Sequence, residues 1–521
     1  MLTSETHIRS PRAPHRPSTR PWLLTLAAIG ALALIVGIAV TDNFHVGVFH
    51  DDAMYVILAR SLATGEGYRY LNLPGAPVAT HFPPGYPALL ALVWRFAPVF
   101  PANVTIFKLL NAVFLGASAI LIAQLVRERF VSKAWAMGVG VITAVSVPLL
   151  VLVTMLLSES LFLTLLLASL LLGERLIDAA PNVRRALGLG VLVGCLTLVR
   201  THGVVLVPAV VLPLLLQRRW REAVVFAVSA VVVIAPWQLW SGSHADTLPA
   251  PLEGNYGSYI GWWFRGYHEM GPSMIFETLK RTVPETSSMM TALFSPAGGA
   301  TAHALTLVAL TALGAFGAFA LVRRAPVTLI FLLAYSAIVL VWPFQPSRFV
   351  WGVWPLVLFV MAAAGSSRWR RPVRLLLGGL LLWVGAGYAA YEVRAARGGW
   401  WASISRAGDN RISAALAWTS ANTSPADVVA ADDEGAVFLY TGRKAVPVAS
   451  FTTAHYLRVR SAELEAREGL EPLLAAYPVR AVLVGSRATF NAAEYLSTRP
   501  VPLLAPREQF DGGAAFTVLP R

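Results

Sequence analysis

Charged residues are scarce in this chain. Asp, Glu, Lys and Arg together make up 13% of its 521 residues, whereas hydrophobic residues make up 56%. A soluble domain usually carries about 25% charged residues. The composition therefore excludes an ordinary soluble globular protein and indicates an integral membrane protein.

Cysteine is almost absent as well. Cys195 is the single cysteine and lies in an apolar run, so it cannot form an intramolecular disulfide. Its simplest interpretation is a small buried hydrophobic residue. The tail after residue 392 also lacks a Gly-rich phosphate loop and a cluster of residues with metal-ligand spacing. For the whole chain we predict no cofactor and no metal site, although a divalent metal is not excluded.

Long uncharged runs are what the chain has instead. Residues 22–40 carry no charge, and at about 1.5 Å per residue such a helix crosses a hydrocarbon core of about 30 Å. Similar runs recur as far as residue 391 and predict a polytopic α-helical membrane protein with about eleven spans, possibly twelve. The predicted spans are residues 22–40, 104–126, 134–150, 153–173, 186–201, 203–217, 222–241, 301–321, 326–344, 349–365 and 373–391.

The arginines predict the orientation, because basic residues that flank spans stay in the cytoplasm. Residues 1–21 are rich in Pro and Arg, so we expect a disordered cytoplasmic N-terminus. The later basic clusters are at 127–133, 184–185, 218–221, 323–324 and 368–374. All five lie on the cytoplasmic side of a bacterial inner membrane if the apolar piece 85–100 does not cross the membrane. The net charge of +14 is thus an orientation signal and no indication of nucleic-acid binding.

This topology divides the chain into a membrane module, residues 22–392, and a periplasmic α/β domain, residues 393–521. Two loops of the module are also periplasmic, 41–84 with an interfacial helix over 53–63, and 242–300. In the tail we expect strands at 427–431, 445–449 and 479–485, and helices at 410–421, 462–476 and 489–496. We interpret the tail as an accessory lid or an acceptor-docking domain.

Ionisable residues collect at the outer ends of the spans. They are Asp51, Asp52, His81, Glu159, Arg200, His202 and Arg348. Charged groups beside spans are costly and tend to mark function, so the pattern predicts a polar cavity at the outer boundary. Simpler roles remain open: Asp51 or Asp52 as a helix cap, Arg200 and Arg348 reaching headgroups, and Glu159, His202 or His81 serving the structure.

Several motifs in this order resemble one family. They are HDDAMYVILAR at 50–60, GEGY at 65–68, HFPPGYP at 81–87, LSESLF at 157–162, LTLVR at 196–200, PW at 236–237, RF at 348–349 and WP at 354–355. Together they are similar to the GT-C glycosyltransferases, in particular the branch of protein O-mannosyltransferases and lipid A aminoarabinose transferases. The resemblance covers residues 20–390. The acidic pair is Asp-Asp where those enzymes usually have Asp-Glu, and the tail matches neither.

The resemblance implies a GT-C-like fold and a membrane glycosyltransferase. The expected donor is a sugar on a polyprenyl phosphate held among membrane lipids, and the acceptor is a glycan, a lipid or a protein. Asp51 aligns with the family's general base for an inverting displacement. Asp52 is expected to orient the acceptor or share the proton, while Arg348 and Arg200 would neutralise the leaving phosphate.

Four further residues belong to the predicted substrate site. Tyr55 follows the acidic pair as the family's Tyr does, His81 would assist the phosphate or the acceptor, Glu159 would support the arginines, and His202 would bind substrate. Other functions remain open: a transporter or flippase of lipid-linked sugars, an oligosaccharide transferase or ligase, and a membrane-anchored binding protein that acts through its tail.

Overall fold

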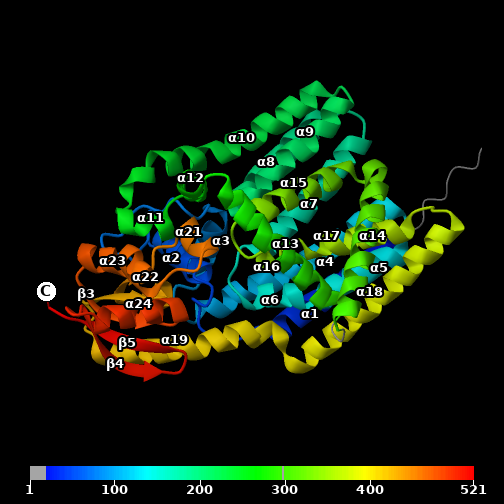
Figure 1. Cartoon of the computed structure of the whole chain (residues 1–521). Coiled ribbons are helices and arrows are strands. Elements are labelled where there is room, and N and C mark those ends of the chain that lie inside the picture. The colour runs from blue at the N-terminus through cyan, green and yellow to red at the C-terminus, as the bar shows by residue number, and fades with distance from the viewer. Residues whose placement is uncertain (1–18, 296–298, 521) are drawn as a thin grey trace, which may run out of the picture.

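The computed structural model describes residues 19–295 and 299–520, and it shows a bundle of helices joined to a smaller part that contains the strands (Figure 1). The predicted disordered N-terminus lies outside the described residues up to residue 18. Figure 1 shows the C-terminal strands beside α2, far from the opposite end of the bundle. The two predicted parts of the chain thus meet at one end.

Six described helices are long and apolar enough to cross a membrane. They are α1 (Thr19–Val40), α4 (Asn103–Phe130), α7 (Glu159–Asp178), α10 (Trp220–Ser243), α14 (Ala300–Arg324) and α18 (Arg371–Gly398). The pair α5 (Lys133–Val145) and α6 (Val147–Thr154), bent by 42°, makes a seventh if it counts as one span. Shorter helices complete the bundle: α8 (Val183–Val199), η1 (Thr201–Val205), α9 (Leu206–Leu216), α15 (Pro326–Val341), α16 (Ser347–Trp351) and α17 (Trp354–Ser366).

Each of the eleven predicted spans overlaps a helix. By length and composition, however, only six or seven spans among the described residues are long and apolar enough to cross a membrane. The number of eleven therefore stays a prediction. The segment 85–100 contains α3 (Gly85–Phe96), a helix of 12 residues. At 1.5 Å per residue it is roughly 18 Å long, which is less than the hydrocarbon core. The arginine pattern requires that residues 85–100 do not cross the membrane, and this short helix is compatible with that requirement.

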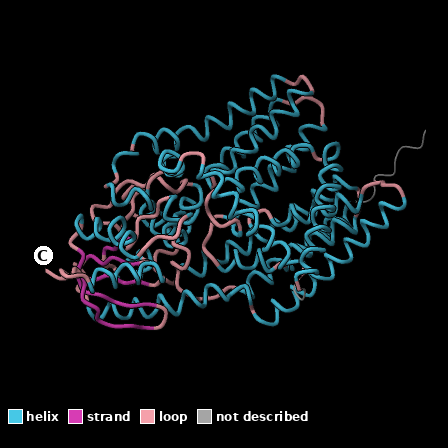
Figure 2. The backbone as a smooth tube through the Cα atoms, in the orientation of Figure 1, coloured by secondary structure: helices cyan, strands magenta, loops and turns pink. Residues whose placement is uncertain are grey.

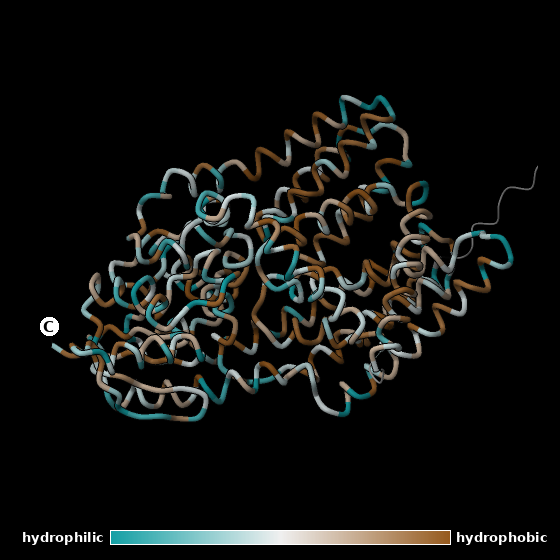
Figure 3. Tube along the Cα trace, in the orientation of Figure 1, coloured by the Kyte–Doolittle hydropathy of each residue, from teal (hydrophilic) through white to brown (hydrophobic). Residues whose placement is uncertain are grey.

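The surface of the bundle is apolar, as a lipid-facing surface must be. Val232, Val308 and Leu382 are more than 60% exposed on three of the long helices. Figure 3 shows these helices in the brown of hydrophobic residues, whereas the C-terminal part is mixed. Cys195 is exposed on α8, so its prediction as a buried residue is wrong: an apolar run in a membrane can turn outward as well as inward. The bundle lies in a membrane.

One predicted span is broken at a place that matters for function. The sequence predicts a continuous helix over 153–173, but α6 ends at Thr154 and α7 begins at Glu159. Met155 is extended, and the side chain of Asn111 donates to its carbonyl oxygen at 2.6 Å. An unpaired carbonyl is expensive in a membrane, so Asn111 stabilises the break. The break puts Glu159 in the first turn of a helix.

The outer loops are also helical. The first contains α2 (Asp51–Ala63) and an irregular segment before α3. The second contains η2 (Ala245–Thr247), η3 (Ala250–Leu252), α11 (Glu253–Tyr256), α12 (Tyr259–Met270) and α13 (Ser273–Phe294). Nine of the thirteen residues of α2 are buried, Asp52 among them. Helix α2 is therefore an internal helix, whereas the sequence led us to expect an interfacial one.

The C-terminal part has a five-stranded sheet in the order β2-β1-β3-β5-β4, drawn in magenta in Figure 2. The strands are β1 (Val428–Ala431), β2 (Lys444–Pro447), β3 (Val479–Val484), β4 (Leu504–Phe510) and β5 (Gly513–Val518). The first three are parallel, and the β4–β5 hairpin runs antiparallel beside β3. The three predicted strands agree with β1, β2 and β3, whereas the hairpin was not predicted.

Helices cover this sheet. They are α19 (Ser403–Asn422), α20 (Glu434–Thr441), α21 (Thr453–Leu457), α22 (Ala462–Glu465), η5 (Ala466–Leu470), α23 (Glu471–Ala476) and α24 (Arg487–Thr498), with η4 (Trp400–Ala402) leading from the bundle. The predicted helices at 410–421, 462–476 and 489–496 overlap α19, α22 to α23, and α24. Helix α20 was not predicted.

Helix α20 packs directly on α2. A Cβ atom placed on Gly435 would lie 2.6 Å from the Cβ atom of Ala53 and 2.6 Å from Met54 Cε, so only glycine permits this approach. Lys444 Nζ also donates to the carbonyl oxygen of Leu71. These contacts fix the C-terminal part against the loop that carries the acidic pair.

Candidate active site

A cavity of about 730 Å³ lies where the bundle, both outer loops and the tail meet. Six of the eight predicted site residues line it: Asp51, Tyr55, His81, Arg200, His202 and Arg348. The other two, Asp52 and Glu159, lie behind its wall. Residues that are almost 300 positions apart in the sequence thus converge, as the prediction of an outer polar cavity requires.

The backbone before α2 is strained where it presents Asp51. His50 has φ +57° and ψ −59°, and the N–H of Asp51 donates to the carbonyl oxygen of Phe49 across it. This is a γ-turn with positive φ, a rare conformation for a non-glycine residue. Such strain persists only where the surroundings impose it and is concentrated at functional sites. It turns the chain sharply into α2, so that Asp51 faces the cavity.

Four charged residues form a continuous chain of ion pairs. Arg348 Nη2 lies 2.9 Å from Asp51 Oδ2 and 2.8 Å from Glu159 Oε1, and Arg348 Nε donates to the same Glu159 oxygen at 2.9 Å. Arg200 Nη1 lies 2.9 Å from Glu159 Oε1. Both arginines therefore turn inward to Glu159, which excludes their being simple headgroup contacts. The positive charges of the two guanidinium groups balance the negative charges of the two carboxylates.

Glu159 is the buried centre of this chain. Its side chain is 2% exposed, against 23% for Arg348 and 20% for Asp51. Removing one partner of a buried ion pair leaves a charge uncompensated at a cost of about 3–5 kcal/mol. Glu159 therefore contacts both guanidinium groups, and the supporting role expected of it stays a prediction.

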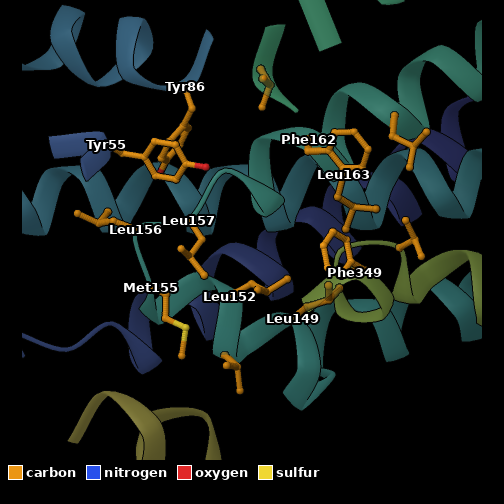
Figure 4. Close-up of a cluster of buried hydrophobic side chains, with 14 of the residues drawn as sticks. Tyr55, Tyr86, Leu149, Leu152, Met155, Leu156, Leu157, Phe162, Leu163 and Phe349 are labelled. Atoms are coloured by element: carbon orange, nitrogen blue, oxygen red, sulfur yellow. The ribbon is translucent and has the colours of Figure 1, made fainter. Parts of the chain in front are cut away.

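Below the ion pairs the wall is apolar. Tyr55 packs edge-on against Phe82 and Tyr86, and its hydroxyl lies 3.0 Å from Ser158 Oγ. Figure 4 shows Tyr55 and Phe349 in one cluster of buried side chains with Leu156, Leu157 and Phe162. A dry wall strengthens the electrostatic interactions above it, because the local dielectric constant falls.

The two adjacent carboxylates have opposite environments. Burial disfavours ionised Asp51, but Arg348 and then His50 outweigh this and hold the pKa of Asp51 below its ordinary value. Burial raises the pKa of Asp52, although three backbone N–H groups oppose the shift. Asp51 is thus the ionised carboxylate that faces the cavity.

Asp52 is bound to its own loop. Its carboxylate accepts hydrogen bonds from the N–H groups of Gly47 at 2.8 Å, Phe49 at 3.2 Å and Ala53 at 3.0 Å, and its side chain does not line the large cavity. The geometry is at odds with the predicted contact to an acceptor. The three hydrogen bonds hold the turn that presents Asp51, and they do not cap α2, whose N-cap residue is His50.

The tail contributes a residue that the sequence did not reveal. Glu434 Oε1 lies 3.3 Å from His50 Nδ1 and accepts a hydrogen bond from Tyr256 at 2.8 Å. Burial opposes ionisation of His50, but Glu434 more than offsets it and raises the pKa of His50 to about 9. His50 is therefore an additional cation beside Asp51. No local pattern joins residues 50 and 434, so only the fold reveals the pair.

His81 is a neutral histidine in this arrangement. Burial is the main cause that lowers its pKa to about 4, and its Nδ1 lies within hydrogen-bond distance of the carbonyl oxygen of Gly257. A carbonyl only accepts, so Nδ1 donates and Nε2 carries a lone pair. His81 can accept a proton or a hydrogen bond at Nε2, but it cannot donate one there to a phosphate.

Aromatic rings form the side of the cavity that faces the tail. Trp262 stacks with Phe344 at a centroid distance of 5.1 Å, and Phe344 stacks with Phe451 at 5.6 Å. His202 lies within 6.0 Å of Trp342 and 5.2 Å of Phe349. Sequence analysis missed these rings because aromatic residues are common throughout an apolar chain. They give the cavity the mixture of apolar walls and few polar groups that ligand pockets share.

Among the described residues, no group of three or more His, Cys, Asp or Glu side chains could hold a metal ion. The cationic groups that face the cavity near Asp51 are Arg348, Arg200 and His50. An anionic ligand entering here would meet guanidinium groups, which bind phosphate oxygens through strong charge-assisted hydrogen bonds.

Sequence comparisons find no relative, since no protein-family model and no curated protein sequence matches. Several solved structures are similar in fold, among them ArnT and AglB. ArnT from Cupriavidus metallidurans, bound to undecaprenyl phosphate, has a TM-score of 0.57 at 12% identity, over 96% of this chain and 98% of that one. The archaeal oligosaccharyltransferase AglB from Archaeoglobus fulgidus, in complex with an inhibitory peptide and a dolichol-phosphate, has 0.52 at 12% identity, over 90% and 70%. The predicted resemblance is confirmed at the level of the fold, because the chain shares the fold of ArnT and AglB.

Proposed function

We propose that this chain is a membrane glycosyltransferase. It moves a sugar from a polyprenyl-phosphate donor to an acceptor on the outer face of a bacterial inner membrane. The observation that carries the proposal is the Asp51–Arg348–Glu159–Arg200 chain at a cavity on a GT-C fold. ArnT, which shares this fold over almost its whole length, was solved with undecaprenyl phosphate.

The donor phosphate binds to Arg348 and Arg200 in this proposal. Arg348 is 23% exposed and already spans Asp51 and Glu159, so an anion can reach it from the cavity. A phosphate that takes Nη2 of Arg348 competes directly with Asp51. Losing this cation removes the main influence that depresses the pKa of Asp51. Donor binding therefore makes Asp51 a stronger base at the moment when a base is needed.

The transfer is a single inverting displacement. Asp51 accepts the proton of the acceptor hydroxyl or amine, whose oxygen or nitrogen attacks the anomeric carbon. The bond between that carbon and the phosphate oxygen breaks, and polyprenyl phosphate leaves with the electron pair. The negative charge that gathers on the phosphate is stabilised by the two guanidinium groups.

The remaining predicted residues take supporting positions. Glu159 holds the guanidinium groups, Asp52 holds the turn before α2, and Tyr55 contacts the same serine as Arg200. His81 belongs on the acceptor side, since its Nε2 accepts hydrogen bonds. His202 lines the cavity among aromatic rings. In this proposal residues 393–521 form a periplasmic domain.

A transfer assay tests the proposal. Purified protein in lipid vesicles is given a polyprenyl-phosphate sugar and a crude envelope acceptor, and the release of polyprenyl phosphate is measured by mass spectrometry. We expect release by the wild type and none by Asp51→Asn, which still binds undecaprenyl phosphate. Near-normal release by Asp51→Asn contradicts the assigned base. Movement of intact donor across the vesicle without release indicates a flippase.

Oligosaccharide transfer is the second candidate, because AglB shares the fold. Such enzymes often need a divalent metal, whereas the proposed site neutralises the phosphate with arginines. We expect EDTA to leave the release of polyprenyl phosphate unchanged. Loss of release that returns with added Mn²⁺ or Mg²⁺ favours the second candidate.

A further inference from the structure

The cavity has two chemically different ends. The end in the bundle carries Arg200 and Arg348, whereas the end in the tail carries Asp432, Glu434 and the hydroxyls of Ser486 and Thr489. None of the described tail residues that line the cavity is a lysine or an arginine. The one basic group there, His455, lies 3.0 Å from the carboxylate of Glu465. An anion is therefore favoured at one end and disfavoured at the other.

The tail end coincides with a switch point of the sheet. Strand β1 lies between β2 and β3, and all three are parallel. The chain leaves β1 toward β2 on one side and returns on the other side with β3. Open sheets of this kind bind ligands in the crevice outside the carboxyl ends of the strands at such a point. Here Asp432 follows β1, and Ser486 follows β3 by two residues.

The polar groups in this crevice are held in place. Asp432 Oδ2 accepts hydrogen bonds from the N–H groups of Gly485 at 2.6 Å and Ser486 at 2.9 Å, and from Thr489 Oγ1 at 2.6 Å. Ser486 Oγ lies 2.8 Å from Thr489 Oγ1. Asp432 Oδ1 has no hydrogen-bond partner in the described part of the chain. One carboxylate oxygen is thus anchored and the other remains as a fixed acceptor.

The crevice is close to the reacting groups. Asp432 is two residues from Glu434, so their Cα atoms are at most about 7.6 Å apart. Glu434 Oε1 lies 3.3 Å from Nδ1 of His50, the residue before Asp51. A molecule of one or two sugar units can therefore contact Asp432 while a hydroxyl group reaches Asp51.

We propose that this crevice is the acceptor subsite and that it binds an uncharged polyhydroxylated group, a sugar or a polyol, in preference to a phosphorylated one. Hydroxyl groups of such a ligand donate to Asp432 Oδ1 and exchange hydrogen bonds with Ser486. The aromatic wall of Trp262 and Phe451 offers flat apolar faces on which a sugar ring can lie. The carboxylate of Asp432 repels an anionic acceptor, whereas the charge of Glu434 is balanced by His50. The role of the crevice as the acceptor subsite rests on the proposed function, whereas its preference for an uncharged ligand does not.

Two matched probes test the charge preference. Full-length protein in nanodiscs is titrated at pH 7 with methyl glucoside and its 6-phosphate, and binding is followed by the intrinsic tryptophan fluorescence of the protein. We expect methyl glucoside to bind more tightly than its 6-phosphate. A 6-phosphate that binds the wild type at least as tightly as methyl glucoside overturns the proposal, and so does the absence of binding by methyl glucoside.

Variants locate the binding. Asp432→Asn should weaken methyl glucoside binding about tenfold, because a hydrogen bond to a charged group becomes one to a neutral group. The control Asp427→Asn changes a carboxylate that holds a loop before β1 by accepting from Ser424 at 2.7 Å, and it should have no effect. Ala488→Lys adds a cation to the crevice and should tighten binding of the 6-phosphate. Equal effects of the two Asn variants, or no effect of Ala488→Lys, contradict the assigned position.

Binding of undecaprenyl phosphate distinguishes a failure of this inference from a failure of the proposed function. Each variant should bind this lipid as the wild type does, which also shows that the variant is folded. Failure of the wild type to bind the lipid contradicts the proposed function and leaves the glucoside preference standing. Normal lipid binding together with a preference for the 6-phosphate overturns the acceptor inference alone.

Discussion

Arg348→Ala is the most informative perturbation of the proposed donor site. The guanidinium group of Arg348 contacts Asp51 at 2.9 Å and Glu159 at 2.8 Å. Its removal takes away a phosphate ligand and leaves Asp51 at the cavity and Glu159 behind its wall with Arg200 as their nearest guanidinium group. Both changes act against an anion, so we expect weaker binding of undecaprenyl phosphate.

The size of the effect follows from the hydrogen bonds at stake. One hydrogen bond to a charged group contributes about 1.5–3 kcal/mol, which corresponds to roughly a 10- to 150-fold change in Kd. The unbalanced charge of Asp51 and Glu159 acts in the same direction. Combining Arg348→Ala with Asp51→Asn should therefore recover part of the lost affinity.

Binding is measured by native mass spectrometry or by tryptophan fluorescence in nanodiscs. Arg499→Ala is a matched control, because Arg499 is 27% exposed, pairs with Glu471 and does not line the cavity. We expect this control to bind the lipid as the wild type does. Equal Kd values for Arg348→Ala and the wild type, with both proteins folded, refute the assignment of Arg348 to the phosphate.

Two further predictions concern the loop before α2. Asp52→Ala leaves the N–H groups of Gly47 and Phe49 without their partner, which costs about 1–3 kcal/mol for each group. The thermal unfolding temperature should therefore fall, and it should fall by less for Asp52→Asn. An unchanged unfolding temperature for Asp52→Ala contradicts the positioning role. The folded-state pKa of His50 is raised from 6.5 to about 9, so its pair with Glu434 contributes stability that is complete below pH 6.5 and is lost as the pH rises through 9. Glu434→Gln should remove this part of the pH dependence of unfolding, and a variant that keeps the full dependence would show that another group titrates.

The sequence was sufficient for most of the membrane module, because hydrophobic runs and flanking arginines are local signals. It was insufficient at the break before α7. Residues 147–157 are apolar without a Gly or a charge to mark an interruption, and the group that stabilises the break, Asn111, is 44 positions away from Met155. A break that depends on a distant partner cannot be found from periodicity.

The acidic pair shows a similar limit within two residues. Successive helical side chains point about 100° apart, so adjacent carboxylates rarely share a task. The sequence supplies no sign of which one faces the cavity. The structure distinguishes them by their partners, Arg348 for Asp51 and backbone N–H groups for Asp52.

The tail was the least predictable region. The hairpin of β4 and β5 was missed because Arg507, Glu508 and Gln509 interrupt the apolar alternation of an exposed edge strand. Its contribution to the cavity was missed because the pairs that create it, such as His50 with Glu434, join residues hundreds of positions apart. Such pairs depend on how the two parts dock.

A structure of the protein with undecaprenyl phosphate in a lipid nanodisc tests the central claim most directly. The account predicts phosphate density within hydrogen-bond distance of Arg348 and Arg200, with the contact between Arg348 and Asp51 broken and the Asp51 carboxylate free toward the cavity. Phosphate bound elsewhere, with the 2.9 Å contact between Arg348 and Asp51 intact, would contradict it.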